Sequence, residues 1–278
     1  MGVMLEVVIP VLMPSKYLPN LQELLRNSCN QIRIVYVLDY KDGTAEHEDN
    51  IFSNSSGELF LRGSYGSPGN ARNAGLEVCT SEYICFWDSD DLPQLENLCI
   101  TLCNLTHLNP EVVIGKWNTV QNRGEVQGSR PIDIGLNPGL WRCIFKRSAI
   151  GSTRFTSLLW GEDQVFLAQI LAKNIKVLVV DEILYTYRQN SIDSLTSKKH
   201  NSKDLQQASR ICQEILSHSS NSNLLVITFM LFRQSISMIK FGNGSTKLHG
   251  IKVLAISLMI FLKKVNWKTF FSSYSEWK

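Results

Sequence analysis

The sequence predicts an α/β protein with a mixed, mainly parallel sheet flanked by helices and a helical appendage at the C-terminal end. Val7–Val11 and Ile32–Leu38 are short, continuous apolar runs, which are typical of strands buried on both faces. Between them, Tyr17–Asn30 carries leucines at helical spacing. A strand, a helix and a second strand within about 35 residues form a βαβ unit, whose crossover makes the two strands parallel.

The composition fits one large domain, or a core domain with an appendage. The chain has 278 residues, of which 44% are hydrophobic and 19% are charged. The net charge is +3, but residues 241–278 contain six Lys and a single Glu, so the first 240 residues carry about −2. We therefore expect a near-neutral body with a basic tail, and no nucleic-acid partner.

Cysteine usage indicates a reducing compartment. The number of cysteines is odd, no Cys-x-x-Cys pair occurs, and no His or second Cys pair completes a zinc set with Cys99 and Cys103. Reduced thiols in a cytosolic protein are expected. Glu6 and Pro10 interrupt the short apolar start, so no signal peptide is predicted.

The second predicted strand ends at Asp39. Nucleotide-binding folds place an acid there against the ribose or base, but many strands also end in Asp to form a turn. Both interpretations stay open for Asp39.

A glycine-rich turn at 63–69 follows a third short strand, Leu59–Leu61, and leads into a helix at 70–76. Backbone N–H groups at such a helix start can bind an anion. The turn contains neither Gly-Lys-Ser nor Gly-Lys-Thr, which excludes the phosphate loop of an ATPase. Arg72 and Asn73 open the helix, where they either reach a diphosphate, brace the neighbouring carboxylates, or only hold the turn in place.

Tyr83–Asp91 is the stretch around which the predicted site is organised. Its apolar residues predict a buried strand that runs into Asp88, Asp90 and Asp91, at the sheet edge where open α/β folds bind ligands. Carboxylates this close raise one another's pKa, and Mg²⁺ or Mn²⁺ relieves the repulsion while leaving coordination positions for phosphate. The alternative is a solvated acidic turn. The buried strand in front of it favours a metal–diphosphate site.

The next part of the chain predicts a helix, two strands and a loop. Leu95–Leu108 repeats leucine at helical spacing, and Val112–Trp117 is a further apolar strand. Residues 121–138 are polar and glycine-rich, which predicts a mobile loop near the site. Leu140–Arg147 alternates in part and predicts a strand behind the acceptor pocket.

A second acidic motif, Trp160–Asp163, precedes an apolar helical pattern. Acids in the first turn of a helix are common because they complement the macrodipole. In the catalytic interpretation, one carboxylate of Glu162 or Asp163 removes a proton from a hydroxyl nucleophile. The strand Val177–Val180 and the segment Tyr185–Arg188 follow.

The order of these parts resembles family 2 glycosyltransferases of the GT-A fold, and in particular the bacterial enzymes that build capsule or lipopolysaccharide repeat units. The shared features, within residues 5–195, are an Ile-Pro first strand, an acid after the second strand, Ala71-Arg72-Asn73-x-Gly75, Asp88-Ser89-Asp90-Asp91 and Glu162-Asp163. Each motif is weak alone, but five in this order are specific. One part departs from the family pattern: the usual Asp-Asp-Gly-Ser becomes Asp39-Tyr40-Lys41-Asp42-Gly43-Thr44. This departure leaves the identity of the donor's nucleotide open.

The resemblance implies roles for the donor residues. Pro10 and Asp39 would line the uridine pocket. Asp90 would bind the metal directly, with Asp88 as a second ligand that lies nearer the ribose, and Asp91 is the acid that usually follows. The implied nucleotide-sugar site comprises Pro10, Asp39, Arg72, Asp88, Asp91 and Arg188, the last in a region that often closes over the diphosphate.

The resemblance also implies the reaction. Asp163 would be the general base, Glu162 would orient the acceptor, and Mn²⁺ or Mg²⁺ would neutralise the leaving diphosphate in an inverting transfer. The donor would be a nucleotide-sugar, expected to be a UDP-sugar, and the acceptor a glycan or lipid-linked saccharide in surface polysaccharide synthesis. One alternative is a sugar nucleotidyltransferase, but the glycine-rich basic loop of that class is replaced here by Val11–Lys16. Another is a non-catalytic module that binds a nucleotide-sugar or glycan.

The expected domains are a glycosyltransferase domain at 1–205 and a helical appendage at 206–278. The first divides into a nucleotide-sugar half at 1–100 and an acceptor half at 101–205.

Two apolar stretches of the appendage, Leu224–Phe232 and Ile251–Leu262, are shorter than the roughly 20 residues that span a bilayer. These helices either pack on the catalytic domain or in a homodimer, or they lie on an anionic membrane surface with Trp267 and its aromatic neighbours. The second alternative predicts a cytoplasmic protein, peripheral on the inner face of the bacterial plasma membrane.

Overall fold

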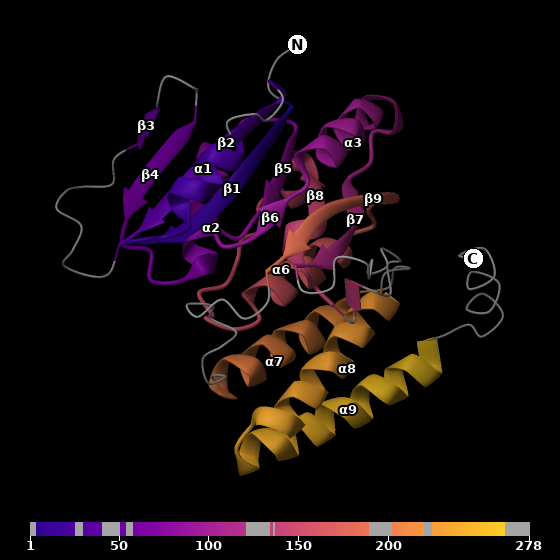
Figure 1. The fold of residues 1–278 in the computed structure, drawn as a ribbon. Helices are drawn as coiled ribbons and strands as arrows, with labels where there is room; N and C mark the ends of the chain where they lie inside the picture. The colour runs from indigo at the N-terminus through magenta and orange to yellow at the C-terminus, as the bar shows by residue number, and fades with distance from the viewer. Residues whose placement is uncertain are drawn as a thin grey trace. The chain divides into compact units, whose positions relative to one another are not determined.

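The computed structural model describes residues 4–25, 30–40, 51–53, 58–120, 134–135, 137–188, 202–219 and 224–264. The chain divides into two compact units (Figure 1). Unit 1 comprises Met1–Ser129, Gly139–Leu159 and Ile175–Ser197, and unit 2 comprises Arg130–Pro138, Trp160–Asn174 and Lys198–Lys278. The predicted loop at 121–138 lies mostly outside the described residues.

Unit 1 is built on a nine-stranded sheet with the order β3-β4-β2-β1-β5-β8-β7-β9-β6. Strands β4, β2, β1 and β5 are parallel neighbours, as are β7 and β9, whereas β3, β6 and β8 run antiparallel to theirs. The predicted mixed, mainly parallel sheet is confirmed. The strands are β1 Leu5–Leu12, β2 Ile32–Asp39, β3 Ile51–Ser53, β4 Leu59–Gly63, β5 Tyr83–Phe86, β6 Leu92–Pro93, β7 Val112–Thr119, β8 Cys143–Lys146 and β9 Val177–Tyr187.

Helices of unit 1 connect these strands. They are α1 Leu18–Leu25, α2 Pro68–Val78, α3 Leu95–Leu108, the 3₁₀ helix η1 Leu140–Arg142 and the short α5 Arg147–Ile150. The segment predicted as one strand at Leu140–Arg147 is therefore a 3₁₀ turn, a short strand and the start of a helix. That prediction is wrong at both ends, because partial alternation is a weak signal over eight residues.

The core of unit 1 depends on a close approach between α2 and β1. Val7, Val8 and Ile9 are fully buried, so β1 is covered on both faces. Gly75 of α2 lies so near this strand that a Cβ atom there would come within 2.4 Å of Val8 Cγ1. Glycine is required at this position because any side chain would push the helix off the sheet.

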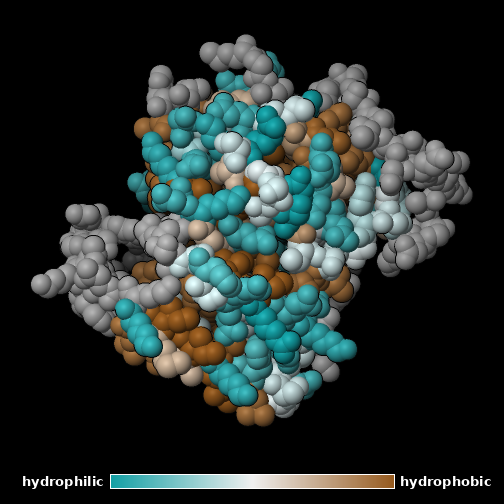
Figure 2. All heavy atoms as spheres, turned by 180° about the vertical axis from the view of Figure 1, so that it is seen from behind, coloured by the Kyte–Doolittle hydropathy of each residue, from teal (hydrophilic) through white to brown (hydrophobic). Residues whose placement is uncertain are grey.

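The described part of unit 2 includes the helices α6 Glu162–Leu171, α7 Ser202–His218, α8 Leu224–Phe241 and α9 Gly244–Lys264. Helix α9 packs along α8, where a Cβ atom on Gly250 would meet the Ser235 carbonyl oxygen at 2.9 Å. The Gln206 side chain joins α7 to α9 by donating to Thr246 Oγ1 at 2.6 Å. Apolar surface, brown in Figure 2, remains over the C-terminal helices.

Helix α9 is longer than the apolar stretch that the sequence pattern predicted. Within the part of the chain that the structure describes, Gly244–Lys263 is long and apolar enough to cross a membrane, judged by length and composition alone. Core helices of proteins outside membranes can pass the same test, although only 22% of this segment is buried. The expectation that this region is too short to span a bilayer is therefore wrong as to length.

Candidate active site

The central parallel strands bring acidic residues of unit 1 to one edge of the sheet. β1 pairs with β5 up to the register Val8↔Phe86, and Trp87 continues the ladder by donating its N–H to the Val8 carbonyl at 3.1 Å. On the other side of β1, β2 ends at Asp39. Asp39 and the residues from Asp88 onward therefore follow the carboxyl ends of parallel strands, where open α/β sheets bind ligands.

Arg72 braces the first carboxylate of the acidic cluster. Its Nη2 donates to Asp88 Oδ1 at 2.9 Å, and 8% of the Arg72 side chain is exposed against 34% of Asp88. The guanidinium also lies over the ring of Phe155, with 5.5 Å to the ring centroid. The close packing of Gly75 on β1 holds α2, and with it Arg72, in this position.

Asn73 has a structural role. Its Nδ2 donates to the Phe155 carbonyl at 2.9 Å, and the Phe155 N–H donates back to Asn73 Oδ1 at 2.8 Å. This exchange fastens the segment after α5 to α2. Of the interpretations that the sequence left open, Arg72 supports a carboxylate and Asn73 holds backbone.

Asp91 is nearly fully buried, with 3% exposed. Its Oδ1 accepts the backbone N–H of Arg188 at 2.7 Å, while Oδ2 is buried without a hydrogen-bond partner among the described residues. Tyr185, which is also fully buried, accepts the Asp88 N–H through its hydroxyl at 3.0 Å. The end of β9 thus holds the turn that carries the acids.

Crowding raises the pKa of these acids. The pKa of Asp91 is raised from 3.8 to about 8: desolvation is the largest cause, the negative charge of Asp88 adds to it, and the hydrogen bond from the Arg188 N–H opposes it. Desolvation also raises the pKa of Asp88, while the Arg72 guanidinium lowers it and Asp90 raises it again. The charged forms are costly here, and a bound cation would relieve that cost.

Asp39 holds the turn before α2. Its Oδ1 accepts the backbone N–H groups of Tyr65 at 2.7 Å and of Gly66 at 3.3 Å. Gly66 has a φ of +71°, which glycine adopts without strain. These contacts account for Asp39 without a ligand. Its contact with a nucleotide stays a prediction, as does that of Pro10, a half-buried residue of β1 opposite Val37.

The second acidic motif lies in unit 2, at the start of α6. Gly161 precedes the helix with a φ of +85°, and a Cβ atom there would come within 2.9 Å of Ala208 Cβ, so the site requires glycine. Glu162 is buried, whereas Asp163 is partly exposed and its Oδ1 accepts the Gln164 N–H at 2.7 Å. The first turn of a helix favours negative charge, so this geometry fits a structural role and leaves the catalytic role a prediction.

Arg233 of α8 was missed by the sequence analysis. Burial lowers the pKa of its guanidinium, and the negative charge of Asp163 raises it. Its Nη1 donates to Asn137 Oδ1 at 3.2 Å, and the next residue, Gln234, donates to Gln164 Oε1 at 2.8 Å. α8 therefore places a cation and an amide near the start of α6. The signal in the sequence was a single cation that ends an apolar run.

An aromatic cluster around Tyr185 was also missed. Trp141 stacks on Tyr185 with ring centroids 4.7 Å apart and on Tyr187 at 5.7 Å, and Trp117 meets Trp141 edge-on at 5.0 Å. These residues come from β7, β9 and η1, so no local pattern joins them. Trp117, Trp141 and Tyr187 are partly exposed, and such rings pack well against the apolar side of a ligand.

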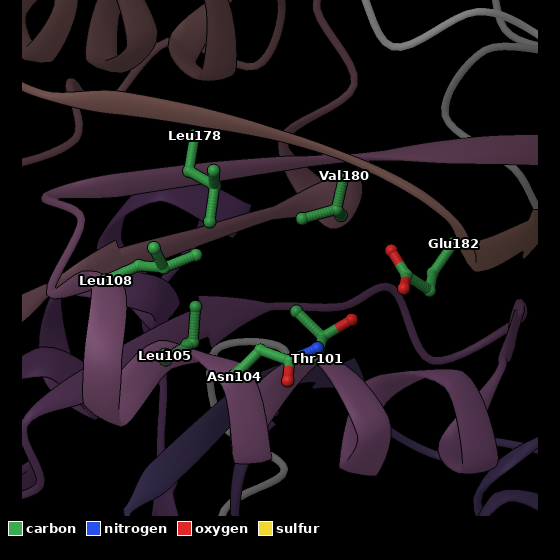
Figure 3. Close-up of a pocket in the computed structure, with 7 residues that line it drawn as sticks. All are labelled: Thr101, Asn104, Leu105, Leu108, Leu178, Val180 and Glu182. Atoms are coloured by element: carbon green, nitrogen blue, oxygen red, sulfur yellow. The ribbon is translucent and has the colours of Figure 1, made fainter.

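The described residues also enclose two cavities, and none of the predicted site residues lines either of them. One, of about 220 Å³, borders α2 and α5. The other, of about 230 Å³, lies between α3 and β9, where Leu105 and Leu108 of the helix face Leu178 and Val180 of the strand (Figure 3). Its lining residues are Thr101, Asn104, Leu105, Leu108, Leu178, Val180 and Glu182.

A mainly parallel sheet with carboxylates grouped at the carboxyl edge of its central strands is the arrangement of GT-A glycosyltransferases. Residues 6–157, more than half of the chain, match the family described as Glycosyl transferase family 2. The chain belongs to this family and is a glycosyltransferase. This membership decides against the nucleotidyltransferase and the non-catalytic module.

Solved structures with the same fold confirm the predicted GT-A architecture. S. aureus TarS 1–349 in complex with UDP-GlcNAc has a TM-score of 0.70 at 18% identity, over 92% of this chain and 80% of that 1–349 chain. The mannosyltransferase PcManGT from Pyrobaculum calidifontis, in complex with GDP-Man and Mn²⁺, has a TM-score of 0.59 at 11% identity, over 99% of this chain and 80% of the other. Glucosyl-3-phosphoglycerate synthase from Mycobacterium tuberculosis, with Mn²⁺, UDP and phosphoglyceric acid, has a TM-score of 0.52 at 15% identity, over 80% of this chain and 81% of the other. No curated protein sequence matches the chain.

Proposed function

We propose that this glycosyltransferase is inverting and metal-dependent, and that it moves a sugar from a UDP-sugar to a glycan or lipid-linked saccharide. The observation that carries the donor site is the acidic cluster at the end of β5, where Arg72 holds Asp88 and the Arg188 N–H holds Asp91. Structures of the same fold solved with UDP-GlcNAc or UDP support a UDP-sugar. PcManGT, solved with GDP-Man, makes a GDP-sugar the alternative.

The residues of the cluster fit Mn²⁺ or Mg²⁺. They offer carboxylate oxygens, which both ions prefer, and Asp91 Oδ2 is buried with no hydrogen-bond partner among the described residues. In that part of the chain no three His, Cys, Asp or Glu side chains are grouped to enclose a metal. This suits an ion held by one or two carboxylates and the substrate phosphates. Asp90 and Asp88 would hold the ion, which when bound would neutralise the leaving diphosphate.

The remaining donor residues would bind and orient the nucleotide-sugar. Pro10 and Asp39 would line the uridine pocket, and Arg188 would close over the diphosphate. Arg72 would favour the ionised form of Asp88, because its guanidinium opposes the rise in pKa that burial causes at that carboxyl. Asp91, through its hydrogen bond from Arg188, would tie the end of β9 to the acidic turn.

The acceptor step would use the acids of α6. The Asp163 carboxylate would take the proton of the acceptor hydroxyl as its oxygen bonds to the anomeric carbon, while the bond from that carbon to the diphosphate breaks on the opposite face. One such displacement inverts the anomeric configuration, and the base would contribute about 10²–10⁴-fold in rate. Glu162 would orient the acceptor.

The test is a thermal-shift panel of UDP, GDP, CMP and dTDP sugars, each with Mn²⁺ and with EDTA. A donor at about 100 times its Kd adds roughly 2.7 kcal/mol of stability, which such a scan detects. We expect a shift with one UDP-sugar that requires the metal. Product from that donor should then carry the opposite anomeric configuration by NMR.

Three results would contradict parts of this proposal. The absence of a shift with every donor would contradict the proposed nucleotide-sugar site. An equal shift in EDTA would contradict the proposed metal dependence. Retention of the anomeric configuration in the product would contradict a single displacement in which Asp163 is the base.

We also propose that the reaction serves bacterial surface polysaccharide synthesis, such as that of capsule or lipopolysaccharide, at the inner face of the plasma membrane. Support comes from the basic C-terminal region, which suits an anionic membrane surface on which a lipid-linked acceptor would be found. Transfer to lipid-linked acceptors extracted from bacterial membranes would test this placement.

A further inference from the structure

The buried face of α9 is small and partly polar, whereas its exposed face is apolar. Thr246, Gly250, Val253 and Ser257 are buried, and they recur at the three- and four-residue spacing of one helix face. Gly250 allows close contact with α8, since a Cβ atom there would also approach Met238 Cβ at 3.0 Å. This face already has its partner within unit 2.

The opposite face carries large apolar side chains. We define the α9 stripe as Leu248, Ile251, Leu258, Met259 and Leu262, whose exposed fractions are 63%, 54%, 50%, 53% and 55%. Leu248, Ile251, Leu258 and Leu262, together with Ala255 between them, are spaced alternately by three and four residues. They therefore form one continuous line along the helix. Apolar side chains in such a line on a helix normally mark the face that is covered by another phase or partner.

Lysines border the α9 stripe on both sides. At about 100° per residue, Lys247 falls on one side of the stripe, and Lys252 and Lys263 fall on the other. All three are exposed. Helix α9 contains no Asp or Glu, so the border carries a single sign of charge.

We infer that the α9 stripe lies on the surface of an anionic lipid bilayer, with the helix axis in the membrane plane. Apolar side chains would enter the headgroup boundary, and the bordering lysines would contact anionic headgroups, as in interfacial amphipathic helices. The inference names the element that makes the membrane contact proposed above, but it rests on α9 and is independent of the donor chemistry.

Two other occupants fit less well. A second copy of α9 would bring lysines against lysines, with no acid on either helix to pair them. A spanning helix would place Lys252 near the middle of the apolar segment, where a charge is costly, and would carry the α8 contact at Gly250 into the bilayer. An anionic surface matches both the apolar stripe and its cationic border.

The test is flotation of the full-length protein with phosphatidylcholine vesicles, with and without roughly one-third phosphatidylglycerol. We expect binding to the anionic vesicles that weakens with salt. The variant Ile251→Ser/Leu258→Ser/Leu262→Ser should lower the partition coefficient at least about tenfold. Removing the charges of Lys252 and Lys263 by substitution with Gln should lower it about fivefold per lysine.

The matched control is Ile100→Ser/Leu108→Ser on α3, which removes apolar side chains with 53% and 46% exposure in unit 1. Its vesicle binding should equal that of the wild type. Donor-dependent thermal shifts should be unchanged in all of these variants, so a failed lipid test and a failed donor test are distinguishable.

Four outcomes would overturn the inference. They are no binding of the wild type to anionic vesicles, equal loss in the α3 control, a dimer in solution that only the α9 variant dissociates, and membrane protein that resists alkaline carbonate extraction. The last two would assign the stripe to a second copy or to a spanning helix. Because the serine variant alters three side chains, urea unfolding checks its fold, and the lysine variant decides the question if the serine variant is destabilised.

Discussion

Arg72 makes a negative charge on Asp88 less costly, because its guanidinium opposes the rise in pKa that burial causes there. The two side chains pair at 2.9 Å, and Arg72 is almost fully enclosed. Breaking a fully buried pair by removing one partner costs about 3–5 kcal/mol, but a third of the Asp88 side chain is exposed, which reduces the expected cost to about 1–2 kcal/mol. Arg72→Met should therefore destabilise the protein by about that amount in urea unfolding. It should also weaken metal-dependent donor binding, because the pKa of Asp88 rises when its cation is lost.

Arg154→Met is the matched control for this prediction. Arg154 pairs with Glu77 at 2.8 Å in the same unit, but both side chains are exposed, so the loss should stay below about 1 kcal/mol. Donor binding should not change. Equal effects of the two substitutions would mean that the Arg72 pair has no special role in the site.

Asp91 should make the metal-free protein less stable as the pH rises. Its pKa in the folded protein is raised from 3.8 to about 8, so between these values the folded state keeps a proton that the unfolded state has lost. This contribution is fully present below pH 4 and is lost as the pH approaches 8. With EDTA present, the free energy of unfolding of wild type relative to Asp91→Asn should therefore fall between pH 5 and pH 8.5. A constant difference across that range would show that Asp91 titrates normally.

At the scale of elements, the position of α2 depends on Gly75. A methyl group there would lie 2.4 Å from Val8 Cγ1, closer than packed atoms can come. Gly75→Ala should cost about 1–3 kcal/mol in urea unfolding, as overpacked cores do, and should reduce turnover because Arg72 moves with the helix. Gly244→Ala is the control, since no atom lies within 4 Å of a Cβ atom at that position. A Gly75→Ala protein as stable as this control would contradict the proposed close contact.

Elements with a continuous local pattern were predictable from the sequence. α3 has the predicted bounds, Leu95–Leu108, because its leucines repeat without interruption. β9 was predicted only to Val180, since Asp181 and Glu182 break the apolar run, but the strand continues to Tyr187 because β7 and β6 pair with it. Pairing between distant strands overrides a local break in the pattern.

The start of helix α9 also could not be predicted from the local apolar pattern. The apolar pattern began at Ile251, whereas the helix begins at Gly244, because Asn243 Oδ1 accepts the Thr246 N–H at 3.1 Å and caps the first turn. In the candidate site, the acids were visible as strand ends. Tyr185 and Arg233 could not be predicted as site residues from the sequence. Tyr185 contacts Asp88, and Arg233 interacts electrostatically with Asp163, so each interaction joins segments that are far apart in the sequence.

For the whole molecule, the proposed metal ligand and the proposed base can be tested by separate substitutions. Asp90 belongs to unit 1 with the rest of the acidic cluster, and Asp163 belongs to unit 2. If Asp90 holds the metal and Asp163 is the base, then Asp90→Asn should abolish the metal-dependent thermal shift with the donor, while Asp163→Asn should keep it. Both should lose transfer, and Asp163→Asn should lose about 10²–10⁴-fold in kcat with little change in the Kd of the donor. Weak donor binding by Asp163→Asn would instead identify a structural acid that stabilises the start of α6. Normal transfer by Asp90→Asn would show that the reaction does not need Asp90 as a metal ligand.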